Sequence, residues 1–396
     1  MKRRSLLLGT ATLLSMTAMA QQGKQPNIVL IMVDDMGYSD LGCYGGEIPT
    51  PNLDNLAKQG VRFTHFCNTG RSCPSRASLL TGLYPQQAGI GMMSEDPHSA
   101  EDHGVHGYMG FLNRNCVTMA EVLKEAGYHT YMAGKWHVGM HGQEKWPLQR
   151  GFDHFYGILS GASSYLRPHG DRNLTLDNQQ LPPPDQPYYT TDAFTDYALK
   201  FVDERPKDGK PYFLYLAYNA PHWPLHAKQA DIDKFVGKYR KGWQKIREAR
   251  MKRMIKMGLI DKSWGLAQWE GRQWDELTEE EQIELDRRMA VYAAQVHCMD
   301  YNVGRLFNSF REIIQLLICI SKFYVQFITD SFNSFSDRIM KCIFDILTND
   351  KYYFIKSGLY CIMNGIIHND LPIWAYRFQL LNSAAKTRTH SCSHDD

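Results

Sequence analysis

The chain has 396 residues, of which 43% are hydrophobic and 22% are charged, with 31 glycines and 17 prolines. This composition excludes a disordered, collagen-like or coiled-coil protein, and the length suffices for one large α/β domain with a smaller one. The formal net charge is +2, and removal of Lys2, Arg3 and Arg4 would leave −1. Because no basic field remains, we expect no nucleic-acid partner.

Residues 1–20 have the features of a signal peptide. Three cations precede an apolar run, Leu6 to Thr17, that is too short to span a bilayer. Ala18-Met19-Ala20 then forms a small-x-small cleavage site before Gln21. A buried helix of the mature domain is the alternative. We therefore expect a periplasmic or secreted protein without a membrane span.

The first apolar run after the signal peptide, Asn27 to Val33, predicts a strand that is buried on both faces. A second run of this kind predicts a strand at residues 213–218, and a weaker one predicts a strand at residues 128–133. Helical patterns lie between them, at residues 52–58, 77–80, 118–125 and 191–203. Alternation of strands and helices predicts an α/β fold, with a largely parallel central sheet and helices on both faces.

Two further segments differ in composition from these elements. Residues 167–189 are rich in Pro, Asn and Asp and predict a long surface loop. Residues 238–256 are strongly basic at helical spacing, which predicts a solvated helical insertion, with an anion-binding lid as the alternative.

Asp34 and Asp35 follow the first strand directly. Ligand sites of open α/β sheets gather at the carboxyl ends of the strands. Two adjacent carboxylates repel each other unless a cation lies between them, and hard oxygen ligands suit Ca²⁺ or Mg²⁺. The dipeptide therefore indicates either a metal site or, alternatively, a turn or helix cap.

Residues 68–82 predict a short helix with an anion site at its start. Pro74 suits the first turn, and Gly82 suits a left-handed exit. Ser72 then lies at the helix N-terminus, where the free N–H groups and the helix dipole favour an anion. Arg76, one turn further on, can face back to the same position.

This stretch resembles the signature of the type I sulfatases, which reads Cys or Ser, any residue, Pro, any residue, Arg and, after four more residues, Thr-Gly. Ser72, Pro74, Arg76 and Thr81-Gly82 match its fixed positions, and Cys73 is a variable one. Other segments resemble the same family in the same order, closest to its bacterial arylsulfatase-like branch. They are residues 27–35, 50–57, 127–139, 151–157, 219–224 and 299–306, so the resemblance covers about residues 26–311.

The resemblance implies the alkaline-phosphatase-like fold of the superfamily and a modified residue in the active site. The family converts its Cys or Ser to formylglycine (3-oxoalanine), which would be Ser72 here. A serine-type enzyme of this kind needs an anaerobic sulfatase-maturating enzyme as a partner. Asp34, Asp35 and the modified Ser72 would bind Ca²⁺, with Mg²⁺ as a possible substitute.

The resemblance also implies roles for four other residues. Arg76 would support the hydrated aldehyde, and His137 would take the proton that expels sulfate. Lys135 and His222 would bind sulfate oxygens and protonate the leaving oxygen. Taken alone, Lys135 and His137 are typical surface residues and His222 a typical turn residue. Positions i and i+2 of an extended segment do point the same way, however, and the family order favours the catalytic roles.

Three weaker expectations concern hydroxyl and carboxylate side chains. Ser160 or Ser163 would also touch the hydrated aldehyde. Thr50 would cap the helix that follows it. Asp300 is interpreted as a structural residue on a helix whose apolar positions are Met289, Ala293, Val296 and Leu306.

The predicted function is hydrolysis of a sulfuric ester, either a sulfated carbohydrate or an aryl sulfate. One alternative is a phosphonate or phosphate monoester hydrolase of the same superfamily. The other is an inactive, truncated remnant, because the family pattern stops near Glu312.

The family should continue with a strand that ends in Asp-Asn-Gly, followed by a small C-terminal α+β domain. Residues 313–396 instead contain no Glu, two Gly and thirteen Ile. Asp330 lies roughly where a metal ligand should be, but Ser331-Phe332 follows it. We therefore predict a signal peptide at 1–20, an incomplete catalytic core at 21–311 and an atypical tail at 312–396. A frame change near codon 312 and a diverged domain are the two explanations for that tail.

Overall fold

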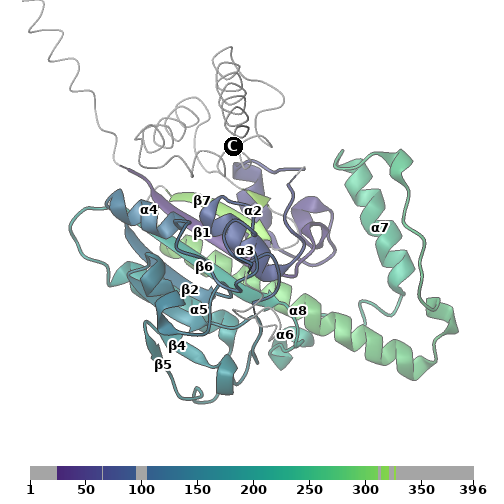
Figure 1. The fold of residues 1–396 in the computed structure, drawn as a ribbon. Helices are drawn as coiled ribbons and strands as arrows, with labels where there is room; N and C mark the ends of the chain where they lie inside the picture. Colours follow the sequence, from purple (N-terminus) through teal and green to yellow (C-terminus); the bar gives the residue numbers. More distant parts are fainter. Residues whose placement is uncertain (1–24, 65, 95–104, 311–313, 321–324, 327–396) are drawn as a thin grey trace, which may run out of the picture.

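The computed structural model describes residues 25–64, 66–94, 105–310, 314–320 and 325–326, and Figure 1 shows their arrangement. The predicted signal peptide, Asp330 and most of the predicted tail lie outside the described residues. None of the helices described there is long and apolar enough for a membrane span.

The central sheet is largely parallel, as predicted. Strand β1 (Asn27–Asp34) lies between β6 (Tyr212–Pro221) and β7 (Ile314–Ile320), and all three run in the same direction. Strand β2 (His129–Lys135) pairs in parallel with β6 and with β3 (His154–Ile158). The complete order is β5-β4-β3-β2-β6-β1-β7-β8.

The two ends of the sheet are antiparallel hairpins. Strands β4 (Leu174–Leu176) and β5 (Gln179–Gln180) extend the sheet beyond β3, so the prediction of a long surface loop over residues 167–189 is wrong for these two segments. Prolines and Asp-Asn pairs do mark turns, but they do not show that a three-residue segment can pair with the open edge of β3. At the other end, β8 (Val325–Gln326) turns back along β7.

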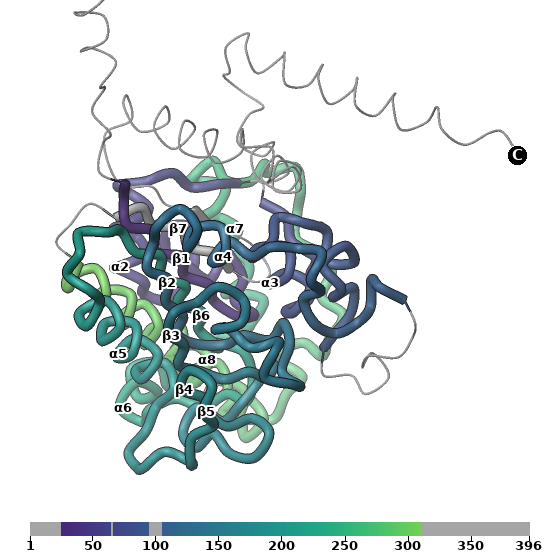
Figure 2. The backbone as a smooth tube through the Cα atoms, turned by 60° about the vertical axis from the view of Figure 1, so that its left-hand side comes forward, coloured from purple at the N-terminus to yellow at the C-terminus, as the bar shows by residue number. Residues whose placement is uncertain are grey.

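Helices cover both faces of the sheet, as the backbone tube in Figure 2 also shows. Along β1, Val29, Ile31 and Val33 pack into one hydrophobic cluster, whereas Leu30 and Met32 pack into another. This alternation is what a strand buried on both faces requires. The first cluster includes α2 (Pro51–Gln59), α5 (Thr190–Asp203), α6 (Gln229–Ile232) and α8 (Glu279–Ser309), and the second includes α3 (Ser72–Thr81) and α4 (Met119–Glu125).

The basic segment becomes helical only from Trp243, as helix α7 (Trp243–Lys256), because Gly242 just before it has a left-handed φ of 89°. Exposed lysines on this helix agree with a solvated face. Its opposite side is anchored, however. Arg250 forms ion pairs of 2.7 Å with Asp40 and with Glu47, in the segment that follows β1.

Helix α2 begins after Thr50, but the Thr50 hydroxyl does not cap it, so that prediction is wrong. The hydroxyl accepts a hydrogen bond from the Gly42 N–H (2.9 Å) and donates one to Asp54 (3.1 Å). The cap comes instead from α8, where Asp300 accepts the backbone N–H groups of Leu53 (2.8 Å) and Asn52 (3.2 Å). The interpretation of Asp300 as a structural residue is thereby confirmed.

Substitution Asp300→Ala should lower the free energy of unfolding by about 1–3 kcal/mol, because it leaves two N–H groups at the start of α2 without an acceptor. Asp300→Asn keeps one acceptor oxygen and should cost less. Urea denaturation of both variants measures the difference. Equal stability of Asp300→Ala and the unsubstituted chain would contradict the capping role.

Candidate active site

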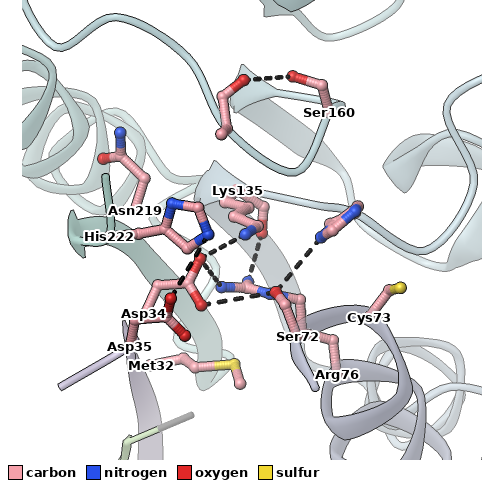
Figure 3. Close-up of polar contacts among 12 residues, drawn as sticks. Met32, Asp34, Asp35, Ser72, Cys73, Arg76, Lys135, Ser160, Asn219 and His222 are labelled. Carbon is pink, nitrogen blue, oxygen red and sulfur yellow. Dashed lines mark hydrogen bonds and ion pairs between the residues drawn. The ribbon is translucent and has the colours of Figure 1, made fainter. Parts of the chain in front are cut away.

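Parallel strands bring the predicted residues to one edge of the sheet. Asp34 is the last residue of β1, and Lys135 is the last residue of β2. His222 follows the end of β6, the strand between them. Ser72 opens helix α3, which packs on the face of the sheet beside Leu30 and Met32. Figure 3 shows these side chains converging at that edge.

Ser72 lies at the centre of the group. Its Oγ is 3.5 Å from Asp34 Oδ1, 3.3 Å from Arg76 Nε and 3.3 Å from His137 Nδ1. Arg76 reaches back from one helical turn further on, as predicted, and Gly82 ends the helix in the left-handed conformation. The hydroxyl of Ser72 is therefore surrounded by a carboxylate, a guanidinium and an imidazole.

Asp34, Arg76 and Lys135 are three fully buried charged side chains. The Lys135 ammonium donates a hydrogen bond to Asp34 Oδ2 and forms an ion pair with it, and Arg76 Nη2 lies 3.5 Å from the same oxygen (Figure 3). Burial alone would raise the pKa of Asp34, but the charges of Lys135 and Arg76 hold that pKa well below its usual range. With two cations to one carboxylate, this buried triad has a positive excess that suits an anion.

His137 is also fully buried, with a left-handed φ of 57° that turns its ring toward Ser72. Burial lowers the pKa of His137 well below its usual value, and the charges of Lys135 and Arg76 lower it further. The ring is thus neutral at pH 7. Nε2 has no hydrogen-bond partner within the described part of the chain. In the neutral tautomer with the hydrogen on Nε2, the Nδ1 atom that faces Ser72 can accept a proton.

His222 lies on the opposite, more open side of the site. Its Nε2 is 3.5 Å from Asp35 Oδ2, and its Nδ1–H donates to the carbonyl of Trp223 at 2.6 Å. The Tyr165 hydroxyl lies 2.8 Å from the carbonyl oxygens of both Asn219 and His222. Tyr165 therefore holds the turn that carries His222. Tyr165 is not among the residues predicted from the sequence, because no local pattern links positions 165 and 222.

The structure does not bring either Ser160 or Ser163 to Ser72. The Ser160 hydroxyl donates to the carbonyl of Ala162 (3.1 Å), as Figure 3 shows, and the Ser163 hydroxyl donates to that of Arg172 (2.6 Å). Cys73 is buried, with its thiol 3.5 Å from the carbonyl of Met92 rather than at the cluster around Ser72. Burial raises the pKa of that thiol, which makes Cys73 a poor nucleophile.

Asp34 and Asp35 offer the hard carboxylate oxygens that Ca²⁺ or Mg²⁺ prefers. Their oxygen atoms are of the type that such an ion binds. Among the described residues, however, no cluster of three or more His, Cys, Asp or Glu side chains could hold a metal. Strand β7 ends at Ile320, opposite Val33, and β8 runs back from there. Asp330, the sequence candidate for a further ligand, lies outside the described residues.

Comparison with known proteins agrees with this geometry. A family model described as Sulfatase matches residues 26–314. The chain belongs to the sulfatase family. Sulfatases are sulfuric ester hydrolases of the alkaline-phosphatase-like superfamily, and the α/β sheet described above has that architecture.

Individual proteins of known sequence or structure align over most of this chain. The arylsulfatase of Klebsiella aerogenes is 35% identical over 321 residues, which cover 79% of this chain and 68% of that protein. An uncharacterized sulfatase of Schizosaccharomyces pombe is 35% identical over 315 residues, which cover 74% of this chain and 56% of that protein. Among solved structures, Ps i-CgsB in complex with k-i-k-neocarrahexaose superposes on this chain with a TM-score of 0.54 and a sequence identity of 27%. The match covers 75% of this chain and 58% of that one. The chain thus spans a little over half to two thirds of the length of these relatives.

The buried triad of this sulfatase predicts an order of stabilities for two variants. Asp34→Asn should lower the free energy of unfolding by about 3–5 kcal/mol, because Lys135 and Arg76 lose their common counter-charge. Lys135→Met should cost less, because Arg76 still faces Asp34. Urea denaturation in the presence of EDTA measures both. A greater loss in Lys135→Met than in Asp34→Asn would contradict this account.

Proposed function

We propose that this chain hydrolyses a sulfuric ester at residue 72, after Ser72 has been converted to formylglycine. One observation carries the proposal: the Ser72 hydroxyl lies within 3.5 Å of Asp34, Arg76 and His137 in a buried site with a positive excess. An unmodified serine would become trapped as its own sulfate ester. An aldehyde supplies a hydrated carbon with two hydroxyls, so that one can bond to sulfur and the other can later help expel sulfate.

The residues around position 72 are placed for the proton transfers and charge changes that this reaction requires. Neutral His137 accepts a proton from a hydroxyl at residue 72, because its ring nitrogen is 3.3 Å from Ser72 Oγ. Arg76 and Lys135 attract sulfate oxygens and offset the negative charge that grows on them. His222, on the open side, donates a proton from Nε2 to the leaving oxygen.

Asp34 and Asp35 would hold the divalent cation, which we propose is Ca²⁺, with Mg²⁺ as a possible substitute. Such an ion supplies positive charge for sulfate oxygens and favours deprotonation of a hydroxyl bound to it. The carboxyl end of β1 supports this assignment, because it brings two adjacent carboxylates to the site, Asp34 beside Ser72 and Asp35 beside His222.

A sulfated glycan or an aryl sulfate is the proposed substrate. The arylsulfatase relative supports the aryl ester, and the relative bound to k-i-k-neocarrahexaose supports a sugar. The predicted signal peptide at residues 1–20 supports action in the periplasm or outside the cell. Formation of formylglycine from Ser72 requires an anaerobic sulfatase-maturating enzyme as a partner.

Mass spectrometry of the peptide that contains residue 72, from protein made in its native host, tests the modification. Conversion of Ser72 should appear as the loss of two hydrogens. Ser72→Ala should abolish hydrolysis of 4-nitrophenyl sulfate while leaving the fold intact by circular dichroism. Cys73→Ala is the matched control and should remain active, because its thiol lies outside the cluster around Ser72. An active Ser72→Ala enzyme, or an unmodified Ser72 in an active one, would overturn the proposal.

Rates on 4-nitrophenyl sulfate and 4-nitrophenyl phosphate separate the proposal from its alternatives. We expect kcat/KM to favour the sulfate, in agreement with the sulfatases to which the chain is related. A preference for the phosphate would favour a phosphomonoesterase. Absence of both activities, and of sulfate release from sulfated sugars, in protein that carries the modified residue would favour an inactive remnant.

Thermal unfolding with and without divalent cations tests the metal site. Ca²⁺ at a hundred times its Kd should stabilise the native state by about 2.7 kcal/mol and raise the Tm relative to EDTA. Asp35→Asn should remove most of that shift, because it deletes one of the two carboxylates. An equal shift in the variant would show that the ion binds elsewhere, and no shift in the unsubstituted chain would contradict the site.

A further inference from the structure

Trp223 is an exposed aromatic residue beside the proposed proton donor. It follows His222 directly after β6, and 64% of its surface is exposed to solvent. Its ring stacks beside the His222 imidazole, with centroids 5.6 Å apart and planes inclined by 29°. A large flat apolar face therefore borders the open side of the site, and most of it is exposed among the residues that the structure describes.

The backbone of Trp223 orients the imidazole of His222, the proposed proton donor. Its carbonyl oxygen accepts the His222 Nδ1–H at 2.6 Å, which leaves Nε2 on the side of Asp35. Pro221 and Pro224 flank the pair and restrict the backbone on both sides. The His222 ring and the Trp223 backbone are thus held together, and the indole lies beside the imidazole.

We infer that the Trp223 side chain is the platform on which the ring that bears the sulfate stacks, be it a pyranose or an aryl ring. This inference rests on the proposed function, in which His222 protonates the leaving oxygen. In an in-line displacement that oxygen leaves on the side opposite residue 72, so the group attached to it must lie near His222. The apolar face of a six-membered ring then meets the apolar face of the indole, and both lose contact with water.

Single exposed aromatic residues are common on protein surfaces, so exposure alone would not indicate a binding role for Trp223. Trp264 shows the difference. It is 68% exposed, but it lies in the 3₁₀ helix Lys262–Trp264, and it has no ring contact with a residue of the site among the described contacts. Trp223 differs because its ring and its carbonyl both contact His222. Trp264 therefore provides a matched control.

Binding to the full chain in a Ser72→Ala background tests the platform without turnover. Isothermal titration calorimetry would use 4-nitrophenyl sulfate, glucosamine 6-sulfate, butyl sulfate and inorganic sulfate. Trp223→Ala should raise the Kd of at least one ring-bearing ester about tenfold, which is the scale of one aromatic stacking contact. Butyl sulfate and inorganic sulfate should bind as before, because neither has a ring. Trp223→Phe should retain most of the affinity, and Trp264→Ala should change none.

The two ring-bearing esters distinguish the source of the ring: an effect on 4-nitrophenyl sulfate alone identifies an aryl platform, and an effect on the sugar sulfate identifies a pyranose platform. Unchanged Kd values for both esters in Trp223→Ala would overturn the inference, as would an equal loss with inorganic sulfate. In the enzyme with Ser72 intact, Trp223→Ala should raise KM more than it lowers kcat. Failure of the intact enzyme to hydrolyse any ester would refute the proposed function, whereas the binding result would still decide the platform.

Discussion

The burial of Asp34 between two cations is the interaction on which the site depends. An isolated carboxylate at this depth would be strongly destabilising, and so would an isolated ammonium or guanidinium. Because Asp34 ends β1, Lys135 ends β2 and Arg76 lies in the first half of α3, these elements must meet for any of the three charges to be tolerated. The charge balance thus links the register of the sheet to the position of the helix that carries Ser72.

Close packing of the strands makes this meeting possible. Gly134, just before Lys135, has a left-handed φ of 116°, and a Cβ there would overlap the carbonyl oxygen of Ala217 in β6. A side chain at this position would push β2 away from β6 and carry Lys135 away from Asp34. Burial, which makes the charges of the triad costly, also lowers the pKa of His137. One environment therefore holds both an excess of positive charge and a neutral imidazole.

Regular patterns in the sequence predicted most of the sheet and helices. The apolar run at the start of β1, the helix that opens at Ser72 and the helix over residues 191–203 are all present to within a few residues. The hairpin β4–β5 was not predicted, because such short strands exist only through the neighbouring strand with which they pair. The cap of α2 is a similar case. The sequence predicts Thr50, its nearest neighbour, but Asp300, about 250 residues away, supplies the cap through a tertiary contact.

The residues of the candidate active site likewise fall into two groups, those predicted from local motifs and those that depend on tertiary contacts. Local motifs with specific spacing were enough to predict the family, the charged residues of the site and Ser72 as the residue proposed for modification. The sequence by itself also separated Ser72 from Cys73. The folded chain was needed to show that Ser160 and Ser163 form hydrogen bonds elsewhere, that Tyr165 holds the His222 turn and that the Trp223 ring is exposed beside it. Those properties depend on contacts between segments distant in the chain, and no spacing within one segment encodes them.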